Sequence, residues 1–90
     1  MGKEIVLFAS EEKSDRASVA AFLRELADKV AEGRIVLISG TEELPLELPE
    51  NVVLEIKAEE EAKKNKIKRS LEVEIEWILG DQGGGGVTLG

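Results

Sequence analysis

Hydrophobic residues recur over residues 15–32 at the three- and four-residue spacings typical of an amphipathic helix. The apolar stripe consists of Val19, Phe22, Leu23, Leu26, Ala27 and Val30. Ser14 can cap the first turn, and Asp15 places a negative charge near the positive end of the helix dipole. Gly33 supplies the residue that commonly ends a helix in the left-handed conformation. The pattern predicts one amphipathic helix over residues 15–32.

Strand-like patterns occupy both sides of this helix, as short apolar runs or as alternating apolar and polar residues. Strands are predicted over residues 4–8, 35–38, 44–48, 52–59 and 66–78. The last of these alternates most strictly, so a one-residue slip would bury several charges. We expect residues 60–65 to be a polar connection. A loop over residues 62–65 would set Glu61 opposite Lys66, and the same register pairs Ile56 with Leu71.

Short connections between successive strands favour antiparallel neighbours. The predicted fold class is therefore α+β, with a single amphipathic helix packed on one face of an antiparallel β-meander of four to five strands, in the order β-α-β-β-β-β. Strand 4–8 lies at an edge, either parallel to strand 35–38 or antiparallel to strand 66–78, and the second arrangement is favoured. Residues 1–79 are expected to form one domain, followed by a flexible glycine-rich tail over 80–90.

Composition excludes several classes of function. The chain has 90 residues and a net charge of −7, with no Cys, His or Tyr. Disulfides, thiol nucleophiles and serine–histidine triads therefore lack their side chains, and we expect neither an enzyme nor a cofactor. No apolar run approaches a membrane span, and no secretory signal precedes the first strand, so a cytoplasmic protein without a membrane partner is expected.

One basic stretch departs from the acidic average: Lys63, Lys64, Lys66, Lys68 and Arg69. It could contact an anion or nucleic acid. The chain has only three aromatic residues for base stacking, and Glu59–Glu61 precede the stretch. A solvated hairpin tip is the favoured interpretation, which makes a nucleic-acid partner unlikely.

Two other features have mainly structural interpretations. Glu72, Glu74 and Glu76 share one face of a predicted strand, with Glu55 nearby, and could hold a hard cation or form an acid–base pair. A wet, flat surface offers few further ligands, so a charged solvent face is favoured. Gly83–Gly86 lacks the context of a phosphate loop and is interpreted as a linker.

The predicted sheet is wider than the predicted helix. A helix of about 18 residues is roughly 10 Å wide, whereas five strands span about 24 Å, so apolar surface should remain uncovered. Trp77, Arg69, Phe8 and Val6 are the candidate contact residues, although a position in the core or at its margin is the favoured interpretation of Trp77. The biochemical function is unknown. The favoured hypothesis is a small non-catalytic interaction or scaffold domain that contacts a protein partner or forms a homodimer through this face or an edge strand. The alternative is anion or nucleic-acid binding through residues 63–69.

Three stretches resemble the Amphi-Trp domain family: LEVEIEW at residues 71–77, FLRELAD at 22–28 and LELPENVVLEIKAE at 46–59. The family takes its name from an amphipathic strand that carries a tryptophan. The resemblance covers about residues 4–79 and leaves the glycine-rich tail outside. It supports the fold, and it implies no activity, substrate or catalytic residue.

Overall fold

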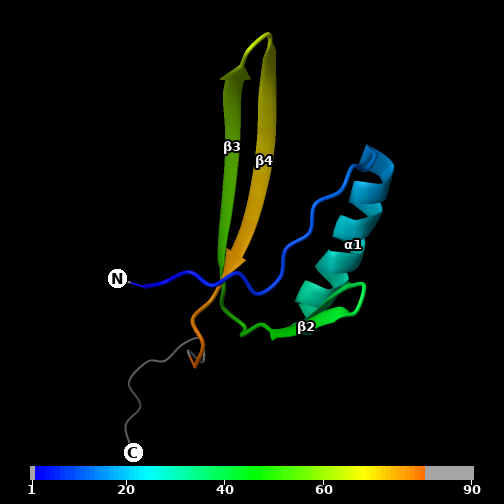
Figure 1. The fold of residues 1–90 in the computed structure, drawn as a ribbon. Coiled ribbons are helices and arrows are strands. Elements are labelled where there is room, and N and C mark those ends of the chain that lie inside the picture. The colour runs from blue at the N-terminus through cyan, green and yellow to red at the C-terminus, as the bar shows by residue number, and fades with distance from the viewer. Residues whose placement is uncertain (1, 81–90) are drawn as a thin grey trace, which may run out of the picture. The chain divides into compact units, whose positions relative to one another are not determined.

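A computed structural model describes residues 2–80, which divide into two compact units, residues 2–48 and 49–80 (Figure 1). The first unit contains α1 (Arg16–Glu32), β1 (Arg34–Ser39) and β2 (Glu42–Glu47), and the second contains β3 (Val53–Lys63) and β4 (Lys66–Glu76). Over residues 2–80 the fold is α+β, with one helix and four antiparallel strands. Apart from Gly80, the predicted tail lies outside the described residues.

Helix α1 confirms the prediction to within one residue. Asp15 is its N-cap, in place of Ser14, because the Asp15 backbone is extended and its carboxylate accepts the Ser18 N–H at 2.8 Å. This hydrogen bond lowers the pKa of Asp15 below its ordinary value. Gly33 ends the helix at φ 82°, and its N–H donates to the carbonyls of Lys29 and Val30 at 3.0 Å.

The core of the first unit lies where α1 packs on β1. Strand β1 pairs with β2 through a short turn, and Ile35 is the one buried hydrophobic residue among residues 2–80. The Leu48 N–H donates to the Gly33 carbonyl at 2.9 Å, which holds the chain beyond β2 against the end of the helix. Within the described residues, the helix thus packs against β1 of a two-stranded sheet.

The second unit is a long β-hairpin whose register differs from the predicted one by two residues. Lys66 faces Lys63 and Leu71 faces Ala58, because β3 continues to Lys63 and a two-residue turn replaces the predicted loop. The extended ladder adds backbone hydrogen bonds. A shift of two residues preserves the alternation, so each side chain stays on its predicted face.

Two finer predictions are not confirmed. Residues 4–8 form no strand, and the four strands make two separate sheets of two strands rather than one meander. A short run with apolar residues on both faces has no preferred register, and Val6 is 78% exposed. Pro49 lies between β2 and β3 and lacks an N–H to donate to a ladder. Helix α1, the one helix of the described residues, is too short and too polar to cross a membrane.

Candidate interaction surface

One face of the β3–β4 hairpin is almost entirely apolar. Directly opposed residues of an antiparallel pair share a face, so the register places Leu54 across from Ile75, and Ile56 across from Val73. We call this surface the apolar face; its residues are Leu54, Ile56, Ala58, Ala62, Ile67, Leu71, Val73 and Ile75. All are exposed except Ile75, which is half-buried, and Leu71 at the centre of β4 is 70% exposed. An exposed hydrophobic surface of this kind is typical of a contact site.

A single charged pair interrupts the apolar face near the hairpin turn. Glu60 lies opposite Arg69, and the Arg69 Nε donates to the Glu60 Oε1 at 2.7 Å. The guanidinium therefore finds its carboxylate within the same hairpin. Because both side chains are largely exposed, the pair contributes at most about 1 kcal/mol to stability.

The opposite surface of the hairpin, which we call the charged face, carries crowded carboxylates toward its open end. Glu55 lies opposite Glu74, and oxygens of Glu55, Glu74 and Glu76 come within 4.8 Å of one another. A hydrogen bond with Glu55, reinforced by the negative charge of Glu76, raises the pKa of Glu74 above its ordinary value. These three residues could offer oxygens to a cation, but they are exposed on an open strand surface.

The predicted basic stretch lies at the turn of the hairpin. Ala62, Lys63, Lys64, Asn65, Lys66 and Ile67 line a shallow surface depression there. Arg69 is paired with Glu60, Lys63 Nζ lies 3.9 Å from Glu61 Oε1, and Lys68 faces Glu61 across the ladder. Carboxylates of β3 thus lie beside Lys63, Lys68 and Arg69 of the basic stretch.

The remaining candidate residues fall in different units. Trp77 is half-buried and follows β4 in the second unit. Phe8 and Val6 belong to the segment before α1 in the first unit, where Phe8 is half-buried and Val6 is exposed. The structure therefore does not join these residues into one site.

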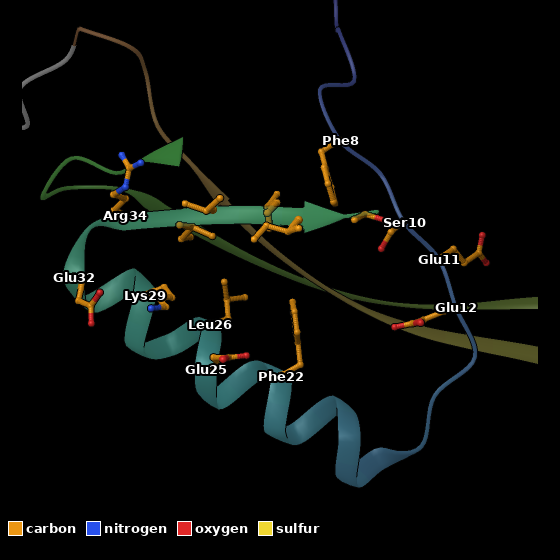
Figure 2. A pocket seen from close by; sticks show the side chains of 15 residues that line it. Phe8, Ser10, Glu11, Glu12, Phe22, Glu25, Leu26, Lys29, Glu32 and Arg34 are labelled. Carbon is orange, nitrogen blue, oxygen red and sulfur yellow. The ribbon is translucent and has the colours of Figure 1, made fainter. Parts of the chain in front are cut away.

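A groove between α1 and β1 was not predicted from the sequence. It has a volume of about 830 Å³, and its lining includes Phe8, Phe22, Leu26, Ile35 and Leu37. Figure 2 shows Phe22 and Leu26 pointing from α1 toward β1, and Phe8 approaching from the preceding segment. The helical stripe indicated the α1 side chains, but no sequence signal places Phe8 beside them. Acidic residues, including Glu11 and Glu12, also line the groove.

Comparison with known proteins bears on the family alone. Searches against curated proteins and against solved structures found no match. The family model described as the Amphi-Trp domain matches residues 1–90, which is the whole chain. The chain therefore belongs to the Amphi-Trp domain family.

Proposed function

We propose that the protein is a small, non-catalytic interaction or scaffold domain that contacts its partner through the apolar face of the β3–β4 hairpin. The observation that carries this proposal is the exposure of the apolar face along both strands. An isolated two-stranded hairpin is marginally stable in water, whereas a third strand or a packed layer stabilises it. A partner that covers this face would stabilise the hairpin and gain binding energy from the same contacts.

The exposed area is large enough to support association. The face spans residues 54–62 of β3 and 67–75 of β4, which corresponds to about 30 Å of length. Five exposed large aliphatic side chains, each about 60% exposed, would contribute on the order of 1 kcal/mol apiece on burial. The five residues are Leu54, Ile56, Ile67, Leu71 and Val73.

A non-catalytic role is part of the proposal. The chain lacks Cys and His, and no charged side chain among the described residues is buried. Catalytic acids and bases usually have pKa values shifted by burial in a pocket. The proposal also assigns the protein to the cytoplasm and gives it no cofactor.

Nucleic-acid or anion binding through residues 63–69 is the less favoured candidate. Glu60 and Glu61 lie beside Arg69, Lys63 and Lys68, and the chain carries a net charge of −7. A phosphate backbone would have to compete with these carboxylates.

Two valines provide a matched test of the apolar face. Val73 lies on the apolar face and is 57% exposed, whereas Val53 lies on the charged face and is 58% exposed. We expect Val73→Ser to weaken association, measured by analytical ultracentrifugation at tens of micromolar and by capture of partners from the native host. Val53→Ser makes the same chemical change on the other face and should leave association unchanged. Equal effects of the two substitutions would contradict the proposal, provided circular dichroism shows both variants folded.

A further inference from the structure

The outer edge of β4 has no strand partner among residues 2–80. Strand β4 pairs with β3 on one side only, and the sheet ends there. An open edge presents a row of backbone N–H and C=O groups that can pair with another strand. In an antiparallel ladder the N–H and C=O groups of alternate residues point away from the partner strand, so every second residue along the 11-residue β4 presents unpaired groups at this edge.

The charges of β4 are arranged with opposite signs about its centre. The first half carries Lys66, Lys68 and Arg69, and the second half carries Glu72, Glu74 and Glu76. Leu71 is the middle residue of the strand. A strand with this pattern is complementary to its own copy when the two run antiparallel, because each positive half then meets a negative half.

We infer that a second copy of the chain pairs with this edge, β4 against β4 and antiparallel, about a two-fold axis at Leu71. This inference rests on the proposed function, since it names the partner of the same hairpin. The register sets Lys66 opposite Glu76 and Lys68 opposite Glu74 of the second copy. The two-fold axis repeats both pairs, which gives four Lys–Glu pairs on the charged face.

The same register joins the two apolar faces into one. Ile67 lies opposite Ile75 of the second copy, and Leu71 lies opposite its own counterpart. The result is a four-stranded sheet in the order β3–β4–β4–β3, with a continuous apolar side. A sheet of this size is more stable than an isolated hairpin.

Other registers of β4 are less favourable. Centring on Ser70 leaves Ile75 and Glu76 outside the ladder, and centring on Glu72 sets this carboxylate against its own copy. Centring on Arg69 opposes two guanidinium groups. Like charges directly opposite each other destabilise a sheet. The Leu71 register alone among these four combines full overlap of the strand with opposite charges.

The other strand edges carry no comparable pattern. The fully overlapped register of β3 with its copy sets Glu55 against Glu61. Strand β2 contains Pro45 and three glutamates. Arg34, the single charged residue of β1, already pairs with Glu47 at 2.7 Å. Charge complementarity therefore selects β4.

The pairing also relieves the carboxylate crowding within each hairpin. Glu74 lies among Glu55 and Glu76, which raise its pKa. In the inferred dimer Lys68 of the second copy approaches Glu74, and Lys66 of the second copy approaches Glu76. Each hairpin thus supplies the cations that the other lacks at this end.

Charge reversal provides the first arm of the test. In K66E/K68E every charged position of β4 on the charged face is acidic, and in E74K/E76K every one except Glu72 is basic. Each variant then opposes like charges in its own homodimer, which should raise the homodimer dissociation constant by at least about tenfold. An equimolar mixture of the two variants should restore association, because the four pairs between positions 66 and 76 and between positions 68 and 74 are again Lys–Glu. Sedimentation equilibrium of wild type, each variant and the mixture measures these constants, with circular dichroism as the check on folding.

Single-cysteine variants provide the second arm, since the chain has no cysteine of its own. L71C brings two sulfurs together at the two-fold axis, where opposed Cα atoms lie about 5 Å apart, within disulfide range. V73C is the control on the same face, because its two copies would be about 13 Å apart. With oxidised glutathione, L71C should form a covalent dimer on non-reducing gels and V73C should not.

The outcomes separate this inference from the proposed function. Restoration in the mixture, together with crosslinking through L71C but not V73C, supports the inference. The wild-type protein could instead associate in a way that depends on Val73, with no effect of charge reversal and no crosslinking of L71C. That result overturns the register and leaves the proposed function intact. A wild-type monomer at tens of micromolar overturns the inference. The proposed function is then tested by capture from the native host: Val73→Ser should fail to capture a partner, other than the chain itself, that the wild type captures.

Discussion

The packing of α1 on β1 leads to a quantitative prediction for two isoleucines on the same strand. Ile35 is 8% exposed beneath the helix, whereas Ile38 is 65% exposed. Replacing isoleucine by alanine removes three carbons, worth about 0.8 kcal/mol each when fully buried. Ile35→Ala should therefore lower the free energy of unfolding by about 2–3 kcal/mol, and more if a cavity remains. Scaled by its burial, Ile38→Ala should cost about 0.8 kcal/mol.

Urea unfolding followed by two probes measures these losses. Far-ultraviolet circular dichroism reports chiefly on α1 in the first unit, and Trp77 fluorescence reports on the second unit. Because residues 1–79 are predicted to be one domain, we expect both probes to show the same shift of midpoint. The control, Ile38→Ala, changes the same residue type on the same strand.

Two results would refute different parts of this reasoning. Equal destabilisation by Ile35→Ala and Ile38→Ala would mean that the helix does not shield Ile35 in solution. A shift in dichroism without a shift in fluorescence would show that the two units unfold independently. The second result would disprove the single-domain prediction and leave the packing of the first unit unaffected.

Three further predictions concern the helix end, the charged face and the hairpin turn. Gly33→Ala should destabilise the protein by about 1 kcal/mol because φ is 82°, a conformation that costs an L-residue energy, whereas the added Cβ would lie at an ordinary contact distance of 3.5 Å from the Leu48 carbonyl oxygen. Thermal unfolding measures the loss, with Gly2→Ala, at a position with open space around it, as the control. Because the pKa of Glu74 is raised in the folded hairpin, protonation of Glu74 contributes to the free energy of unfolding. This contribution is complete below the ordinary pKa of 4.5 and is lost as pH rises through the pKa of the folded state. Urea unfolding by tryptophan fluorescence across this range should show the loss, and Glu74→Gln should remove it; a slope unchanged by the substitution would contradict the assignment to Glu74. Because carboxylates accompany residues 63–69, we expect no retention on heparin at low salt, and salt-dependent retention would favour the anion-binding alternative.

Strict periodicity made parts of the fold predictable. The 3.6-residue repeat and Gly33 located α1, because a helix must place its apolar side chains on one side and a left-handed cap favours glycine. The alternation in residues 66–76 assigned every side chain of β4 to the correct face. The hairpin register was harder to predict from the sequence, because a shift of two residues keeps every side chain on its face and changes only which residues lie opposite each other.

The candidate site divides in the same way. The sequence determined that one face of the hairpin is apolar, that Arg69 interrupts it, and that positive and negative charges occupy opposite halves of one strand, because these features depend only on alternation along the chain. Tertiary structure decided that Glu60 neutralises Arg69, that Glu55 crowds Glu74, and that Phe8 joins the groove beside α1. It also separated the strands into two sheets rather than one. Such contacts join residues that are distant in the chain, and they depend on turn length and ladder register, which local patterns leave unspecified.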